Sequence, residues 1–204
     1  MKFDFLKKLS RETIIRIAIY IGIVLGGFAL DRITKVIVAN NLVLGKLGQV
    51  EIIPNFLYFA YVENTGGAWS ILSNATWLLA IFSTVAVIGI SYFLFKKEVN
   101  IHYFICGSLI VSGGAGNLFD RVVYSAVIDF IETYPLGFSF PIFNVADIFV
   151  VIGAFYMIIY MFIEEHKEKK RSQEKIIDER TFVIINYSCI SIIKHSSSEY
   201  SCGA

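Results

Sequence analysis

Four long apolar runs separate the polar parts of the chain. They are residues 14–30, 75–95, 99–119 and 148–163. The second and third runs contain no charged residue, and the first carries Arg16 near its start. A helix needs roughly 20 mostly apolar residues to cross the ~30 Å hydrocarbon core of a bilayer, and the first and fourth runs reach that length with their flanking residues. The pattern therefore predicts four transmembrane helices over about 13–31, 75–95, 100–119 and 143–164.

The placement of lysine and arginine predicts the orientation of these helices. With four spans both chain ends lie on one side, and that side carries twelve Lys and Arg residues up to Lys175, against four on the other side. Cytoplasmic loops of membrane proteins carry the excess of positive charge. We therefore expect both termini in the cytoplasm and the loops 31–74 and 120–141 outside it.

The first outer loop has the composition of strands. Residues 49–72 are rich in β-branched and aromatic residues, with a turn signal at Pro54 and Asn55. The expected fold is thus an all-α membrane protein with four transmembrane helices and a small extracytoplasmic β-rich region. Residues 1–165 form the membrane domain, and residues 166–204 form a charged cytoplasmic tail that is expected to be disordered beyond residue 176.

Composition agrees with a membrane protein and excludes some functions. The chain is 56% hydrophobic and 17% charged, with a net charge of +1, and it has no basic stripe of the kind that binds nucleic acid. The three cysteines, Cys106, Cys189 and Cys202, have no spacing typical of a disulfide framework or a zinc site. We expect no metal, no cofactor and no nucleic-acid partner.

Polar residues concentrate at the outer ends of the four predicted spans. They are Asp31, Lys35, Asn64, Gly66, Asn117, Asp120, Arg121, Asp129, Asn144 and Asp147. Because all of them lie near one membrane face, the folded bundle can gather them into one site.

Each of these residues also has a purely structural interpretation. Asp31 and Lys35 are spaced as an interfacial ion pair, and Asp147 is placed as an N-cap of the fourth helix. Asn64 and the residues after it resemble a turn. Asn117 is suited to bridging helices.

Two more structural alternatives concern the end of the third span. The glycines at 113, 114 and 116 are typical of closely packed membrane helices. Asp120 and Arg121 are adjacent and could form a solvated pair at the level of the lipid headgroups. Taken together, however, so many polar groups at one depth favour a site.

Absent residue types narrow the chemistry of that site. His102, His166 and His195 all fall on the cytoplasmic side or in the tail, which argues against a zinc hydrolase or a Ser-His-Asp triad at the outer face. Two carboxylates held close together share a proton, because both cannot ionise cheaply. Asp129 and Asp147 could then activate water and protonate a carbonyl oxygen. The residues permit this chemistry without requiring it.

The chain resembles the lipoprotein signal peptidases, also called signal peptidase II, an intramembrane aspartic peptidase family. The matching segments are "DRITK" (31–35), "NTGGAWS" (64–70), "GGAGNLFDRVVYSAVIDF" (113–130) and "FNVADIFVVIG" (143–153). They occur in the family's order and cover roughly residues 14–165. Two features depart from the pattern: Trp69 stands where phenylalanine is commoner, and residues from about 176 onward are unmatched.

The resemblance implies roles for these residues. Asp129 and Asp147 would be the catalytic pair. The substrate pocket would be lined by Asn64, Asn117, Arg121 and Asn144, and Gly66 would bind or support the substrate. Asp31, Lys35 and Asp120 would be supporting positions.

The resemblance also implies a substrate and a location. The family removes the signal peptide from diacylglyceryl-modified prolipoproteins in the bacterial cytoplasmic (inner) membrane and is inhibited by globomycin. A monomer in contact with membrane lipid is expected, with its site on the outer face. The alternative is a small proton-coupled membrane transporter that uses the two aspartates as a relay, although the acids lie at one face and no internal repeat is evident.

Overall fold

The computed structural model describes residues 10–67, 75–96 and 99–199. Trp69 and the end of the "NTGGAWS" segment lie outside the described residues. The chain divides into two units, residues 1–158 and residues 159–204. Its elements are α1 (Arg11–Asn41), β1 (Gly45–Ile53), β2 (Leu57–Asn64), α2 (Thr76–Lys96), α3 (Ile101–Tyr124), β3 (Val127–Thr133), a 3-10 turn (Pro135–Gly137) and α4 (Val145–Glu199).

The helices present apolar side chains to their surroundings, as expected for a protein in a bilayer. Within the described residues, α1, α2 and the Val145–Ile177 part of α4 are long and apolar enough to cross a membrane. Val85 of α2 is 65% exposed and Ile33 of α1 is 57% exposed, so these apolar surfaces need lipid around them. The expected membrane fold of helices with a small β region is confirmed.

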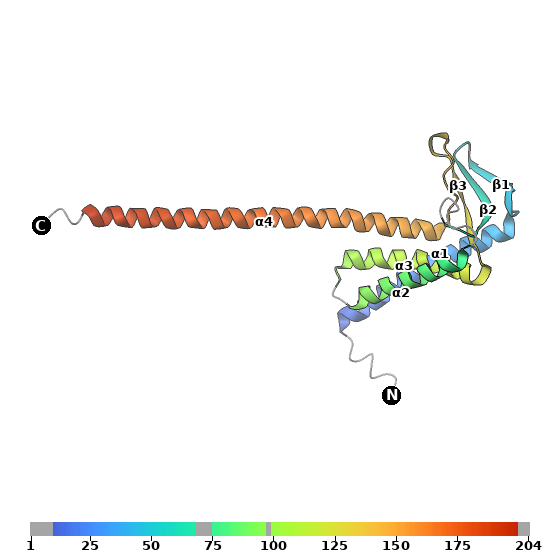
Figure 1. Cartoon of the computed structure of the whole chain (residues 1–204), viewed down its shortest axis with the longest axis horizontal. Coiled ribbons are helices and arrows are strands. Elements are labelled where there is room, and N and C mark those ends of the chain that lie inside the picture. The colour runs from blue at the N-terminus through green and yellow to red at the C-terminus, as the bar shows by residue number, and fades with distance from the viewer. Residues whose placement is uncertain (1–9, 68–74, 97–98, 200–204) are drawn as a thin grey trace, which may run out of the picture. The chain divides into compact units, whose positions relative to one another are not determined.

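Helix α3 differs from the other helices because its small and polar residues are buried. Ser108, Ser112 and Gly113 face neighbouring elements, and Figure 1 shows α3 beside α1 and α2. A Cβ on Gly113 would collide with the carbonyl oxygen of Ala146 at the start of α4, and one on Gly116 would lie 2.7 Å from Asp31 Oδ2. Close helix approach at these glycines is confirmed.

Helix α1 is longer than the predicted span of 13–31, because it continues to Asn41. Residues 32–41, which were expected in the outer loop, are therefore helical. The segment after Asp31 remains helical because its apolar residues continue the outward face, as at Val36, which is 52% exposed. Asp31 and Lys35 consequently lie one turn apart on one helix, and both side chains point inward, where they are buried.

The expected strands form a three-stranded antiparallel sheet in the order β1-β2-β3. Strands β1 and β2 are joined by a turn in which Asn55 has a φ of 59°, which confirms the turn signal at Pro54 and Asn55. Strand β2 pairs with β3 from Leu57↔Thr133 to Asn64↔Val127. This register brings the end of β2 beside the start of β3, where Asp129 lies.

The second unit consists of the later part of α4, which continues to Glu199. This helix includes residues beyond 176, for which a disordered tail was expected. Residues 164–175 are strong helix formers, and two i,i+4 ion pairs lie along them, Lys169 with Glu165 at 2.6 Å and Lys170 with Glu174 at 4.0 Å. These pairs are exposed, so they favour the helix only slightly.

Candidate active site

Asn144 and Asp147 form a reciprocal cap at the start of α4. The main-chain N–H of Asp147 donates to Asn144 Oδ1 at 3.0 Å, and the main-chain N–H of Asn144 donates to Asp147 Oδ2 at 3.1 Å. This is the capping-box arrangement, in which two free N–H groups at a helix start are satisfied at once. Asn144 is thus the N-cap, and the interpretation of Asp147 as the cap itself is wrong. Asp147 lies three residues further on, in the first turn.

Asp129 is held at the beginning of β3 by two amide side chains. Asn64 donates from Nδ2 to Asp129 Oδ2 at 2.9 Å, and Asn144 donates from Nδ2 to Asp129 Oδ1 at 2.7 Å. Asn64 also accepts the main-chain N–H of Gly66 on its Oδ1 at 2.9 Å. Asn64 therefore both forms the expected turn and contacts the site. Its Oδ1 accepts from Gly66 in the turn, and its Nδ2 donates to Asp129.

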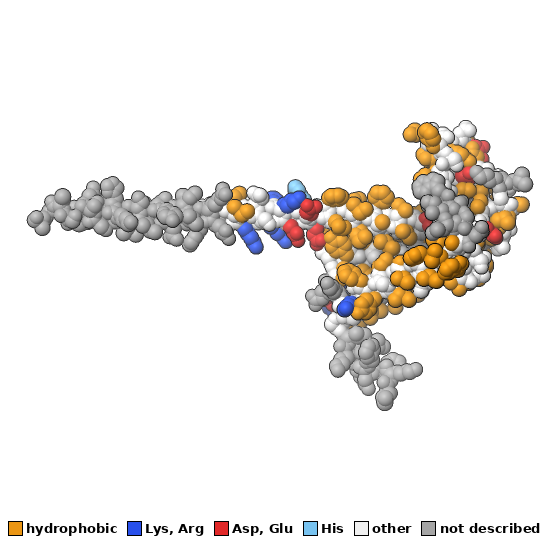
Figure 2. All heavy atoms as spheres, viewed as in Figure 1, with side chains coloured by type: hydrophobic (Ala, Val, Ile, Leu, Met, Phe, Trp, Pro, Cys, Tyr) orange, Lys and Arg blue, Asp and Glu red, His pale blue; other side chains and the backbone are white. Residues whose placement is uncertain are grey.

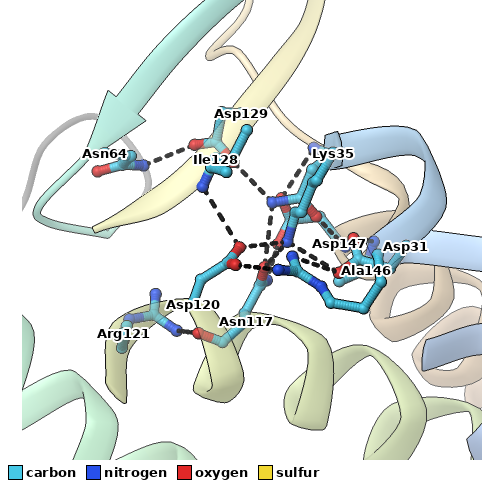
Figure 3. A network of polar contacts seen from close by, with 12 residues as sticks. Asp31, Lys35, Asn64, Asn117, Asp120, Arg121, Ile128, Asp129, Ala146 and Asp147 are labelled. Atoms are coloured by element: carbon cyan, nitrogen blue, oxygen red, sulfur yellow. Dashed lines mark hydrogen bonds and ion pairs between the residues drawn. The ribbon is translucent and has the colours of Figure 1, made fainter. Parts of the chain in front are cut away.

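Asn117 of α3 connects the two carboxylates. Its Nδ2 donates to Asp147 Oδ1 at 2.7 Å, and its Oδ1 accepts from Asn144 Nδ2 at 3.0 Å and from Lys35 Nζ at 3.0 Å. Figure 3 shows Asn117 directed toward Lys35 and Asp147 from the helix below them. The two aspartates thus share one hydrogen-bonded network built from amides.

A buried group of charges lies beside this network. Lys35 Nζ contacts Asp31 Oδ2 at 2.9 Å and Asp120 Oδ2 at 2.7 Å, and all three side chains are at most 1% exposed. Arg32 joins the group through Asp120 Oδ1 at 2.6 Å and Asp31 Oδ2 at 3.2 Å. Two carboxylates and two cations balance, which is the condition for burying charge at tolerable cost. The expected Asp31–Lys35 ion pair is therefore present, but it is buried and shared with Asp120. The expected solvated Asp120–Arg121 pair is wrong, because Asp120 is buried and pairs with Lys35 and Arg32.

The buried charges also fix the elements that carry the aspartates. Asp31 Oδ1 accepts the main-chain N–H of Ala146 at 3.0 Å, another free donor at the start of α4. Asp120 Oδ2 accepts the main-chain N–H of Ile128, next to Asp129, at 3.3 Å. One carboxylate thus holds the helix of Asp147, and the other holds the strand of Asp129.

Arg121 lies at the edge of the site rather than within the buried charge group. Its Nη1 donates to the main-chain oxygen of Asn117 at 3.4 Å. Its Nε has no hydrogen-bond partner among the described residues. Arg121 therefore has donor capacity left beside the carboxylates.

Burial and charge change the acidity of Asp129. Its pKa is raised to about 7, above all because burial disfavours the charged carboxylate. The hydrogen bond from Asn64 opposes this shift, and the charge of Asp147 adds to it. Asp129 therefore holds a proton for part of the time near neutral pH.

Both aspartates open onto one pocket of about 450 Å³. Its polar end is formed by Asn64, Asp129 and Asp147, and the rest of its wall is apolar. The apolar lining comes from Val127, Phe140, Pro141, Ile142, Phe143, Ile148, Val150, Val151 and Ile152. A chain with apolar side chains could lie against this wall and present a polar bond to the carboxylates. Within the described residues, no three His, Cys, Asp or Glu side chains are grouped to hold a metal ion.

Sequence reasoning missed two groups, one half-buried and one fully buried. Arg32 was not expected in the site, although it contacts both Asp31 and Asp120 and its guanidinium lies 5.0 Å from the ring centre of Phe119. Glu132 of β3 is fully buried and accepts the hydroxyl of Tyr134 at 2.7 Å. The apolar alternation of β3 gives no sign that an acid is buried there.

The fold and the site define an integral membrane protein with two carboxylates in a pocket at the end of its helices. Residues 23–163 match the family described as signal peptidase (SPase) II. The chain belongs to this family, which is a family of peptidases. The suspected resemblance to signal peptidase II is thereby confirmed.

Relatives and solved structures agree with this assignment. The lipoprotein signal peptidase of Listeria monocytogenes serotype 4b is 40% identical over 152 residues, 74% of this chain and 97% of that protein. The enzyme of Staphylococcus aureus is 35% identical over 170 residues, 83% of this chain and 99% of that protein. A bacterial membrane enzyme structure obtained by the in meso method at 2.3 Å resolution superposes with a TM-score of 0.66 at 35% identity, over 72% of this chain and 88% of that one. The transporter alternative is not favoured.

Proposed function

We propose that this protein removes signal peptides from diacylglyceryl-modified prolipoproteins by water activated between Asp129 and Asp147. The observation that carries the proposal is that both carboxylates line one pocket and are connected through Asn117 and Asn144. Two carboxylates that share a proton can serve as base and acid in one reaction. Family membership supplies the substrate class.

The surroundings of the two acids suggest their separate roles. Asp147 accepts N–H groups from Asn117 and Asn144 in the first turn of α4, where the helix dipole favours negative charge. Asp129, with its pKa raised to about 7, is the better holder of the shared proton. Asp147 then takes a proton from water as the water oxygen attacks the carbonyl carbon. Asp129 gives its proton to the carbonyl oxygen.

Collapse of the tetrahedral intermediate completes the reaction. The carbonyl reforms, the C–N bond breaks, and the leaving amine takes up the proton that Asp147 received from water. The hydroxyl proton of the intermediate returns to Asp129, which restores the starting state. Arg121, whose Nε has no hydrogen-bond partner among the described residues, is the proposed donor to substrate carbonyl groups.

The membrane setting accounts for the substrate class. The apolar wall along Ile148, Val151 and Ile152 of α4 suits the hydrophobic signal segment, which stays in the bilayer while the scissile bond reaches the acids. We further propose that the protein is a monomer in the bacterial inner membrane, with both termini cytoplasmic and the site on the outer face. Globomycin should occupy the same pocket as the substrate.

The test is cleavage of a lipidated prolipoprotein by the purified protein in lipid nanodiscs. Asp129→Asn and Asp147→Asn should each abolish cleavage while the variants remain folded. Glu132→Gln is the matched control, because it neutralises another buried acid on the same strand outside the pocket lining, and it should retain activity. Substantial cleavage by either aspartate variant would overturn the proposed pair.

A further inference from the structure

The far end of the sheet is built from two turns that lack charged side chains. One is the β1–β2 turn within residues 52–57, and the other is the 3-10 turn within residues 133–140. They are joined because the main-chain N–H of Tyr134 donates to the carbonyl oxygen of Phe56 at 2.9 Å. The rings of Tyr58 and Tyr134 meet edge to face behind them, with centroids 5.6 Å apart.

The apolar side chains of these turns are exposed. We call this group the apolar tip, and its members are Ile52, Ile53, Phe56, Leu136 and Phe138. Leu136 is 96% exposed and Phe138 is 75% exposed. Single exposed apolar residues are ordinary, but turns are usually polar, and a group of five on two joined turns forms a patch that calls for a partner.

The backbone at Leu136 gives a second, independent indication. Leu136 has φ 54° and ψ 25°, a left-handed conformation that is unfavourable for a side chain with a Cβ and that glycine or asparagine adopts far more easily. Because the side chain is almost fully exposed, contacts within the chain do not compensate for this conformation. An apolar medium outside the chain would stabilise this exposed leucine side chain.

The position of the apolar tip identifies that medium as lipid. The strands run across the direction of the helices, and in Figure 1 the turns lie level with the first turn of α4 along that direction. Figure 2 shows hydrophobic side chains gathered at this end of the sheet as well as along the helices. The first turn of α4 belongs to a membrane span, so the tip lies at the depth of the bilayer surface.

The tyrosines behind the apolar tip are typical of a membrane interface. Tyr58 and Tyr134 come next, and their hydroxyls donate to Glu51 at 2.8 Å and to Glu132 at 2.7 Å. Tyrosine is enriched at membrane interfaces because one end of its side chain is apolar and the other is polar. Tyrosines and acids thus adjoin the apolar tip, and Glu51 also accepts the main-chain N–H of Asn55 in the β1–β2 turn at 3.0 Å.

We propose that the apolar tip inserts into the lipid leaflet that surrounds the pocket end of the helices and fixes the depth of the sheet there. Its loop continues through Phe140 into Phe143, which lines the pocket, and Phe143 pairs with Ile131 of β3 through two main-chain hydrogen bonds of 2.8 and 3.1 Å. Anchoring the tip therefore also positions the strand of Asp129 and one wall of the pocket. The lipid contact itself does not depend on the proposed reaction.

Spin labels on single cysteines in lipid nanodiscs test the insertion. Cys189 and Cys202 are replaced by serine, Cys106 is kept because it is buried, and labels are placed by Leu136→Cys or Phe138→Cys. Reference labels are Val85→Cys, on the exposed apolar face of α2, and Glu168→Cys, in the charged segment. Collisions with oxygen report lipid, and collisions with a water-soluble nickel chelate report water.

The labels at 136 and 138 should favour oxygen over nickel several-fold relative to Glu168→Cys and lie shallower than Val85→Cys. Labels as exposed to nickel as Glu168→Cys would overturn the proposal. Dipolar broadening between labels would also overturn it, because it would indicate that a second copy of the chain covers the tip. Protection from nickel that arises only on adding prolipoprotein would overturn it too, because the substrate and not lipid would then cover the tip.

A second variant separates insertion from local folding. Leu136→Asn suits the left-handed backbone and is polar, so it should keep or raise thermal stability in detergent. With Phe138→Asn added, the reporter Phe56→Cys on the neighbouring turn should become several-fold more accessible to nickel. Unchanged accessibility at Phe56→Cys would show that the tip does not hold the turns in lipid. This readout needs no cleavage, so it can fail or succeed independently of the proposed function.

Discussion

The side-chain amide nitrogen of Asn144 lies 2.7 Å from Asp129 Oδ1, and its main-chain N–H donates to Asp147 at 3.1 Å. One fully buried residue therefore contacts both acids. It also starts the helix that carries one of them. The Asn144 side chain caps α4 through its Oδ1 and donates to Asp129 through its Nδ2. Substitutions at this position can separate the two roles.

Asn144→Ser should keep the helix cap and lose the amide donor to Asp129. The amide donor also reaches Asn117 Oδ1, and leaving a buried acceptor without its donor costs about 1–3 kcal/mol. We therefore expect a loss of that size in the free energy of unfolding and a fall in cleavage of about 10- to 100-fold. Asn144→Ala should lose both, with a further loss of about 1 kcal/mol in the free energy of unfolding. Thermal unfolding and kcat/KM of the two variants separate these effects. Near-normal cleavage by Asn144→Ser would remove the amide contact from the mechanism.

Lys35→Met should be strongly destabilising because it leaves Asp31 and Asp120 buried with one cation fewer. Breaking such a buried pair typically costs about 3–5 kcal/mol, measurable by denaturant or thermal unfolding in detergent. Lys169→Met is the matched control, since Lys169 also pairs with an acid one turn away but is exposed. That variant should unfold like the wild type. Equal stability of the two variants would argue against the buried charge group as a structural support.

Gly113→Ala tests the close approach of α3 and α4. The new methyl group would collide with the main-chain oxygen of Ala146 and lie 2.8 Å from Val150 Cγ2. Because a backbone atom cannot yield like a flexible side chain, we expect a loss of about 1–3 kcal/mol and a displaced α4 start. Gly22→Ala in α1, with nothing within 4 Å, should be neutral or stabilise by up to about 1 kcal/mol. Melting temperatures of the two variants give the comparison.

Cleavage should decline as the pH rises through about 7. The pKa of Asp129 is raised to about 7 by burial, and the proposed mechanism needs its proton. Above that pH both acids become charged and the acid function is lost. A pH profile of kcat/KM with a lipidated substrate measures this decline. Full activity at pH 9 would contradict Asp129 as the acid.

The same pKa shift predicts a pH-dependent stability. The folded-state pKa of Asp129 lies above its unfolded value of 3.8, so the folded protein binds the proton more tightly. The resulting stabilisation is fully present below pH 3.8 and is lost as the pH rises to about 7, with an upper bound of roughly 4 kcal/mol. Asp129→Asn should lack this component. Melting temperatures of the wild type and of Asp129→Asn, measured between pH 4 and 8, test this: the wild type should lose stability with rising pH more steeply than the variant.

The sequence alone determined the membrane fold and indicated Asp129 and Asp147 as the proposed acids. Runs of about 20 apolar residues have no stable alternative to spanning helices, and polar residues that interrupt them at one depth indicate a site. Asp129 and Asp147 were identifiable because their motifs are specific. These features depend only on the composition and order of residues, which can be read before the chain folds.

The tertiary structure decided which polar groups meet and what each one does. Asp31 and Lys35 had the spacing of an interfacial ion pair, and the apolar pattern did not reveal where the helix ends or that the pair is buried. Only packing shows that α1 continues and turns them toward Asp120. Arg32 and the capping role of Asn144 depend likewise on contacts between residues far apart in the chain. The physical reason is that burial and hydrogen-bond partners are properties of packed elements, whereas hydropathy is a property of single residues.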